Sequence, residues 1–105
     1  MNITCIIVDD EKLARDLLLE YLQQIPSIQI IGQCGKGKEA VEVIDKLKPD
    51  LVFLDVQMPG MTGFDVLDEI THDPYVIFVT AYDQYAIKAF EKNAVDYLLK
   101  PLDQE

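Results

Sequence analysis

The stretch Leu51-Val52-Phe53-Leu54-Asp55 places four apolar residues in a row directly before an aspartate. A strand with one solvated face alternates apolar and polar side chains, so an unbroken apolar run of this length indicates a short strand that is covered on both faces. Such strands are typical of parallel sheets that lie between two layers of helices. Asp55 is then the first polar group beyond a buried strand.

On either side of this stretch, apolar runs and helical patterns alternate along the whole chain. Further apolar runs predict strands at 3–8, 28–31, 76–79 and 95–99. This alternation predicts an α/β fold with a parallel sheet joined by right-handed crossovers. The helices between the strands are predicted from apolar residues at helical spacing: Leu13, Leu17, Tyr21 and Leu22; Ala40, Val41, Ile44 and Leu47; Phe64, Leu67 and Ile70; Ala86, Ala89 and Phe90.

Length and composition indicate one small domain and exclude several classes of protein. A second hydrophobic core would need roughly twice the 105 residues present. No apolar run approaches the ~20 residues of a membrane-spanning helix. Met1-Asn2-Ile3-Thr4 is not a basic stretch before an apolar core, so we expect no signal peptide. We therefore expect a cytoplasmic protein that does not associate with a membrane.

The charge of the chain is strongly negative. With 19 acidic and 9 basic side chains, the formal net charge is −10. Such a surface repels nucleic-acid phosphates, so we expect no direct nucleic acid binding by this chain. The same acidity suits a cation site, provided that carboxylates converge.

Three residues that often form metal or redox sites are interpreted as structural. Cys5 and Cys34 lie in strand-like apolar runs, which favours two buried, reduced thiols over a disulfide. His72 is the only histidine, and it lies in a polar turn before Pro74. We expect His72 to be a solvated loop residue.

Polar residues follow four of the predicted strands. In a parallel sheet these positions meet at one edge, where ligands of such folds bind. Carboxylates gathered around one lysine would raise one another's pKa, and a divalent cation would relieve that cost. The pattern predicts a Mg²⁺ site suited to phosphoryl transfer, although an Asp-Asp pair alone more often caps a helix. The residues are Asp9, Asp10 and Glu11, then Asp55, then Thr80, and finally Lys100 before Pro101.

The same residues lie in stretches that resemble the response-regulator receiver domain of two-component signalling systems. The resemblance is carried by residues 6–11, 50–63, 79–81 and 96–101, and it extends over essentially the whole chain, 1–105. It implies a flavodoxin-like (CheY-like) fold, with a parallel five-stranded sheet of order 2-1-3-4-5 and helices on both faces. It also implies a phosphoacceptor signalling domain that catalyses only its own phosphorylation and slow dephosphorylation.

The resemblance implies how the acidic residues act. Asp55 would accept a phosphoryl group from a phosphohistidine of a sensor histidine kinase. Asp10 and Asp55 would bind Mg²⁺ (or Mn²⁺) directly, and Asp9 would bind it mainly through water. The backbone carbonyl of Gln57 would complete the protein's share of the ligands.

The remaining implied roles concern the phosphate and the switch. Lys100 would pair with Asp55 or its phosphate, across a Lys100–Pro101 peptide expected to be cis. Thr80, followed by Ala81, would donate its hydroxyl to a phosphate oxygen, and Tyr97 would turn inward as Thr80 moves. From the residues alone, Tyr97 would be interpreted as an ordinary half-buried strand aromatic, and 58–63 as a turn and the start of a helix.

The segment 80–101 resembles, more narrowly, regulators whose output is a LytTR-type DNA-binding domain. We therefore expect an output domain that lies outside this chain and controls transcription. The last helix of the family would begin at 102–105, so we expect it to be missing or truncated. The apolar surface left uncovered would favour a homodimer through the region of the last strand.

Three alternative functions were weighed against this one. Residues 32–38 satisfy G-x-x-x-x-G-K, but a P-loop needs Ser or Thr next, where this chain has Glu39. An aspartate-nucleophile phosphatase would resemble D-x-D, whereas Asp55-Val56-Gln57 ends in an amide. A protein-interaction domain that has lost phosphorylation is disfavoured by the intact set of acids.

Overall fold

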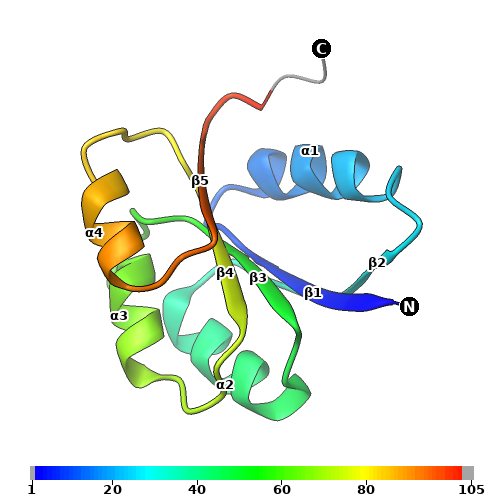
Figure 1. Ribbon diagram of the computed structural model, residues 1–105, viewed down its shortest axis with the longest axis horizontal. Helices are drawn as coiled ribbons and strands as arrows, with labels where there is room; N and C mark the ends of the chain where they lie inside the picture. The colour runs from blue at the N-terminus through cyan, green and yellow to red at the C-terminus, as the bar shows by residue number, and fades with distance from the viewer. Residues whose placement is uncertain (1, 103–105) are drawn as a thin grey trace.

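The computed structural model describes residues 2–102, which form a sheet with helices on both faces (Figure 1). All neighbouring strands are parallel, and their order is β2-β1-β3-β4-β5. The predicted flavodoxin-like fold and strand order are confirmed. The strands are β1 (Ile3–Val8), β2 (Ile28–Cys34), β3 (Leu51–Leu54), β4 (Tyr75–Thr80) and β5 (Asp96–Leu99).

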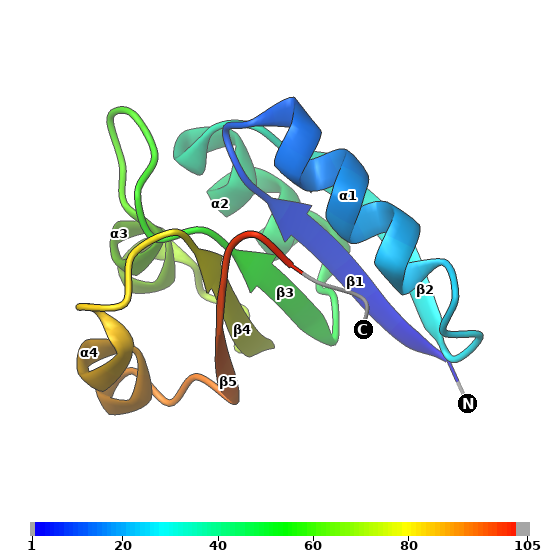
Figure 2. The same cartoon turned by 90° about the horizontal axis from the view of Figure 1, so that it is seen from above.

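The helices divide unequally between the two faces (Figure 2). On one face, Leu18 and Leu22 of α1 (Lys12–Leu22) pack with Ile7 and Phe53 of the sheet. On the other face, α2 (Gly37–Leu47), α3 (Gly63–Glu69) and α4 (Ala86–Glu91) surround a larger core that includes Phe78. The last helix expected from the resemblance falls almost wholly outside the described residues. None of the helices within 2–102 is long and apolar enough to cross a membrane.

Two predicted elements differ from the observed ones. The strand predicted at 28–31 continues to Cys34, and its pairing with β1 continues beyond a register shift between Cys5 and Ile6. Gly32 to Cys34 are therefore part of the strand, and the polar Gln33 is tolerated because it is exposed on an edge strand. Phe90 was predicted on the apolar face of its helix, but 55% of it is exposed. Helix α4 has six residues, of which Ala89 alone is buried.

Both cysteines are free and buried, as predicted. Burial raises the pKa of the Cys5 thiol to about 12 and that of Cys34 to about 11. The thiols are therefore protonated at neutral pH, and they pack as small apolar side chains.

The start of α3 is held tightly against the end of β3. Thr62 caps the helix in a reciprocal pair with Asp65, and the Gly63 amide donates to the Val56 carbonyl at 2.8 Å. A Cβ added at Gly63 would lie only 2.3 Å from the backbone carbonyl oxygen of Asp55. Glycine is therefore required here by a close approach of two backbone segments.

This close approach predicts the effect of an alanine at position 63. Gly63→Ala should lower the free energy of unfolding by about 1–3 kcal/mol, because the added methyl group meets backbone that cannot swing away. The measurement is urea unfolding followed by circular dichroism. Gly32→Ala is the control: its Cβ would make ordinary contacts at 3.6 to 3.7 Å, so its stability should stay within about 1 kcal/mol of the parent. Equal stability of the two variants would contradict the prediction.

Candidate functional site

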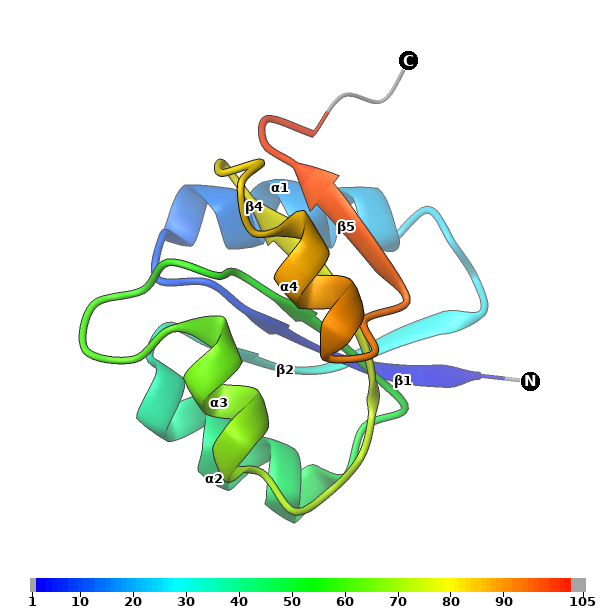
Figure 3. The same cartoon turned by 60° about the vertical axis from the view of Figure 1, so that its left-hand side comes forward.

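Backbone hydrogen bonds continue past the strand ends and fix three residues at one edge of the sheet. The Asp9 amide donates to Cys34, the Asp55 amide to Val8, and the Lys100 amide to Thr80, at 3.0, 3.0 and 2.8 Å. Each residue is therefore placed by the neighbouring strand rather than by its own loop. Figure 3 shows this edge, where β4 and β5 end beside the loops that follow β1 and β3.

A single lysine meets three carboxylates there. The Lys100 ammonium lies 2.7 Å from Asp9 Oδ2, 3.1 Å from Asp55 Oδ2 and 3.3 Å from Glu11 Oε1. The side chains of Asp9 and Asp55 are each 6% exposed and that of Lys100 is 15% exposed, whereas Glu11 extends into solvent. One positive charge thus faces two nearly buried negative charges, where little water is available to screen them, and a third that is exposed to solvent.

Burial and charge pairing act in opposite directions on this cluster. Burial would lower the pKa of Lys100, but the hydrogen bonds and charges of Asp9 and Asp55 outweigh it and raise that pKa. Burial raises the pKa of Asp9, and the charge of Asp55 adds to the rise, although Lys100 opposes it. We describe the Asp9–Lys100 pair as ionised because a 2.7 Å contact is typical of a charge-assisted hydrogen bond.

Two buried polar atoms at this edge have no hydrogen-bond partner within the described residues. They are Asp55 Oδ1 and the hydroxyl oxygen of Thr80, which is fully buried. An unpaired buried polar atom costs about 1–3 kcal/mol, so such atoms usually have a ligand or a task. Asp9, Glu11 and Asp55 also each bring a carboxylate oxygen within 4.8 Å of the others. Hard oxygen donors at this spacing fit Mg²⁺.

The predicted residues Asp10, Gln57 and Ala81 lie around the buried cluster rather than in it. All three are exposed, and with Glu11, Asp55, Tyr82 and Lys100 they line a cavity of about 380 Å³. The Gln57 amide nitrogen donates to the Tyr85 hydroxyl at 2.7 Å. The structure thus brings Asp9, Asp55 and Lys100 into direct contact, with Asp10 and Gln57 at the rim.

Sequence reasoning assigned no role to two residues that support the cluster. Glu11 pairs with Lys100, and its amide donates to Asp9 Oδ1 at 2.9 Å. Arg15 donates to the Asp9 backbone carbonyl at 2.6 Å from one turn along α1. Glu11 belongs to the predicted set of strand-end residues as the third acid of Asp9-Asp10-Glu11, but it was given no role of its own. Nothing in the spacing of the sequence indicates Arg15.

Tyr97 lies on β5, the strand next to β4, which ends at Thr80. Its ring is half-buried and 6.2 Å from that of Phe78, and its hydroxyl donates to the backbone carbonyl of Tyr82. The ring is therefore fixed at both ends, by the core and by the loop after β4. The Lys100–Pro101 peptide is cis, as the resemblance implied.

The comparison with protein families decides between the remaining interpretations. Residues 5–105 match the response regulator receiver domain. The chain belongs to this family. Among its relatives, the transcriptional regulatory protein BtsR of Escherichia coli K12 is 48% identical over 104 residues, which are 97% of this chain and 44% of that protein. A response regulatory protein of Shewanella oneidensis is 50% identical over 105 residues, again 44% of its length.

Solved receiver structures superpose closely on this receiver domain. The response regulatory domain of mrkE from Klebsiella pneumoniae gives a TM-score of 0.86 at 32% identity, covering 95% of this chain and 84% of that chain. CheY in a CheX-CheY-BeF3-Mg+2 complex from Borrelia burgdorferi gives 0.86 at 29% identity, covering 96% and 80%. The chain spans less than half the length of the curated relatives it matches.

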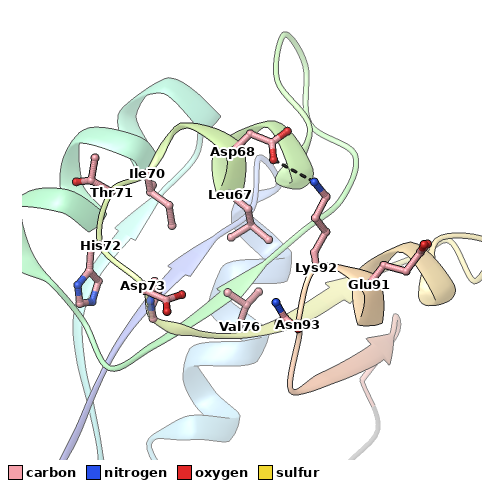
Figure 4. Close-up of a pocket in the computed structure, with 11 residues that line it drawn as sticks. Leu67, Asp68, Ile70, Thr71, His72, Asp73, Val76, Glu91, Lys92 and Asn93 are labelled. Carbon is pink, nitrogen blue, oxygen red and sulfur yellow. Dashed lines mark hydrogen bonds and ion pairs between the residues drawn. The ribbon is translucent and has the colours of Figure 1, made fainter.

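A second cavity of the receiver domain, of about 390 Å³, lies away from the acidic cluster (Figure 4). It is lined by the end of α3, the start of β4 and the end of α4, and Lys92 pairs with Asp68 across it at 3.2 Å.

The prediction that His72, which also lines this cavity, is a solvated loop residue is wrong. Its half-buried ring nitrogen Nε2 lies 2.6 Å from the Pro49 carbonyl, and its amide donates to Asp45, so it anchors the turn rather than being solvated. We place the functional site at Asp55 because the unpaired buried atoms lie there.

The P-loop alternative is disfavoured by the receiver structure itself. Residues 32–34 are strand, and Gly37 already begins α2. The Glu39 carboxylate turns back and accepts from the Gly35 amide at 3.3 Å. A carboxylate therefore lies where a phosphate-binding loop would offer its amides.

The crowded carboxylates of this receiver domain predict a large cost for removing the lysine. Lys100→Met should lower the free energy of unfolding by about 2–4 kcal/mol without divalent cations, because it leaves two buried carboxylates facing each other. Millimolar Mg²⁺ should restore part of the loss. Lys92→Met, which breaks the exposed pair with Asp68, is the control and should cost less than about 0.5 kcal/mol. Equal losses in denaturant unfolding would refute the prediction.

Proposed function

We propose that this chain, residues 1–105, is a phosphoacceptor domain in which Asp55 accepts a phosphoryl group from a phosphohistidine of a sensor histidine kinase. The observation that carries the proposal is the state of the Asp55 carboxylate. It is buried, one oxygen pairs with Lys100, and the other has no partner in the described chain. An Asp55 oxygen would form the new bond to phosphorus while the phosphorus–nitrogen bond breaks and the leaving imidazole keeps its electron pair.

The residues around Asp55 fit a divalent cation and a phosphoryl group. Asp9, Asp10, Asp55 and the backbone carbonyl of Gln57 would hold Mg²⁺ or Mn²⁺, and Glu11 is a further candidate from its place in the cluster. When bound, the cation supplies positive charge for the phosphoryl oxygens. The related CheY complex, which contains BeF3 and Mg²⁺, supports this assignment.

Lys100 and Thr80 would act on the phosphoryl group itself. The Lys100 ammonium, now shared among three carboxylates, would turn toward the new phosphate oxygens. The Thr80 hydroxyl, unpaired in the described structure and followed by Ala81, would donate to one of them. Tyr97 lies beside the strand that carries Thr80, which supports its proposed role as the aromatic that turns inward.

One contact favours this function over an aspartate-nucleophile phosphatase. A phosphatase of that type needs a carboxylic acid two residues after the nucleophile to protonate the leaving group. Gln57 occupies that position, and its amide is engaged with Tyr85. The side chain has no proton of suitable acidity to give.

We infer further that the domain controls transcription through a LytTR-type output domain in a longer protein. The BtsR relatives are transcriptional regulatory proteins, and this chain matches 44% of their length. The net charge of −10 supports an arrangement in which the output part, rather than this domain, contacts DNA. A cytoplasmic location is part of the same proposal, since a cytoplasmic receiver could meet both kinase and DNA.

The proposed phosphorylation has a direct test. Treatment with acetyl phosphate should add the mass of one phosphoryl group with Mg²⁺ present and none without it, and Asp55→Asn should prevent the gain. With beryllofluoride and Mg²⁺, the amide resonances of Thr80 and Tyr97 should shift. Thr80→Val should keep the mass gain but lose the Tyr97 shift, because only the hydroxyl is removed. A parent chain that gains no mass and shows no shift would refute the proposed function.

We propose in addition that the chain forms a homodimer through the region of β5. An apolar hollow of about 530 Å³ reaches the start of β5 through Val95, the residue before that strand. Its other lining residues come from the first halves of β1, β3 and β4, namely Ile3, Leu51, Tyr75 and Ile77, with Asn2 and Asp50 at its edge. Tyr75 is 72% and Val95 55% exposed, which is unusual for an apolar surface of a monomer. Light scattering should therefore show the mass of a dimer that dissociates on dilution. A monomer at high concentration, or a Tyr75→Lys variant that dimerises as well as the parent, would refute this.

A further inference from the structure

The side chain of Gln57 links the acidic cluster to α4 by a hydrogen bond that is separate from the proposed switch residues Thr80 and Tyr97. Gln57 lies two residues after Asp55, in the loop between β3 and α3, and its amide donates to the Tyr85 hydroxyl at 2.7 Å. Gln57 lines the cavity beside Asp55, and Tyr85 lies 28 residues further along the chain, just before α4. This hydrogen bond joins the loop after β3 to the residue that precedes α4.

The ring of Tyr85 is held in place by other rings. Its centroid lies 6.2 Å from those of Phe64 and Tyr82, with edge-on geometry to both. Phe64 in turn contacts Phe78 at 5.1 Å, and the Lys88 ammonium lies 4.5 Å above the Phe64 ring. Tyr85 also packs against the larger core. These contacts restrict the Tyr85 ring and therefore the position of its hydroxyl. The hydrogen bond to this hydroxyl then determines the orientation of the Gln57 side chain.

The backbone of Tyr85 belongs to the start of α4. It is the N-cap residue, and its carbonyl accepts from the Ala89 amide at 2.9 Å in the first turn. A shift of α4 would therefore move the Tyr85 hydroxyl, and a turn of Gln57 would pull on the same hydroxyl. Coupling of this kind is reciprocal: whatever α4 does to Gln57, Gln57 does to α4 with the same free energy.

We propose that Tyr85 is a positioning residue for the cation site: by holding the Gln57 side chain, it fixes the part of the loop whose Gln57 backbone carbonyl would be a ligand. The proposal rests on the proposed function, because it uses Gln57 as a ligand of Mg²⁺. Magnesium requires near-octahedral geometry, so it responds to a small misplacement of one ligand. The same contact couples occupation of the site to the position of α4, independently of Thr80 and Tyr97.

The test compares variants that remove one end of the hydrogen bond at a time. Tyr85→Phe keeps the ring and its contacts and removes only the hydroxyl, and Gln57→Met keeps the length of the side chain without the amide. In an NMR titration of the 105-residue chain with Mg²⁺, each should raise the Kd by about 2- to 10-fold, the range that one neutral hydrogen bond supplies. The double variant should bind no more weakly than Gln57→Met alone, because both changes remove the same contact.

A matched control and a second readout separate positioning from general stability. Tyr75→Phe removes a tyrosine hydroxyl from a residue that is 72% exposed at the other end of the sheet, and it should leave the Kd unchanged. With beryllofluoride and Mg²⁺, Tyr85→Phe should keep the Thr80 shift but reduce the shifts of amides 86–91. A role in stability alone would lower the unfolding midpoint and leave the Kd and these shifts as in the parent.

The possible results distinguish this inference from the proposed function. If the parent chain responds to Mg²⁺ and beryllofluoride but Tyr85→Phe has the parent Kd, or if the two single effects add in the double variant, the positioning role is refuted. The phosphoacceptor function then stands. If the parent chain itself neither binds Mg²⁺ nor responds to beryllofluoride in an Asp55-dependent way, both are refuted.

Discussion

The Lys100 ammonium, surrounded by Asp9, Asp55 and Glu11, is the interaction on which the arrangement of the site depends. One cation stabilises three anions only partly, and two of the carboxylates are nearly buried. The protein keeps this unfavourable charge balance at the edge of an otherwise apolar sheet, where hydrogen bonds between strands hold the backbone in place. A site with excess negative charge and unpaired oxygens is ready for a ligand that brings positive charge and accepts hydrogen bonds. Mg²⁺ together with a phosphoryl group meets both needs.

Much of this arrangement could be predicted from the sequence because it follows from the topology of a parallel sheet. Unbroken apolar runs locate the strands, and the residues that follow them must meet at one edge, which is how Asp9, Asp55, Thr80 and Lys100 could be grouped before any coordinates. Glu11 could be grouped with the other strand-end acids, but its direct pairing with Lys100 could not be predicted, because that pairing depends on how the loop after β1 turns. The anchoring of His72 depends on contacts with Pro49 and Asp45, and the exposure of Phe90 on the shortness of α4. These are tertiary facts that no local pattern encodes.

Within residues 2–102, tyrosines join the loop after β4 to the rest of the domain by hydrogen bonds. Tyr97 donates from β5 to the Tyr82 carbonyl, and Tyr85 accepts from Gln57 beside the acidic cluster. The segment that leads into α4 is therefore held from the strand behind it and from the loop in front of it. A change in the acidic cluster could therefore reach α4 through Tyr97 or through Gln57. The contacts of the Tyr85 ring with Phe64 and Tyr82 limit how far this segment can move in response to one of them alone.

The parallel order β2-β1-β3-β4-β5 also bears on when the site comes into existence during folding. Each backbone hydrogen bond that places Asp9, Asp55 or Lys100 joins residues from different strands, and every such pairing needs a long intervening loop to close first. Only Asp9 and Glu11, among the charged residues that the structure describes in the cluster, are neighbours in sequence; Asp55 and Lys100 come from distant parts of the chain. The chemistry of Asp55 is therefore a property of the completed chain topology. A partly folded chain would carry every residue of the site and yet present no site to a kinase.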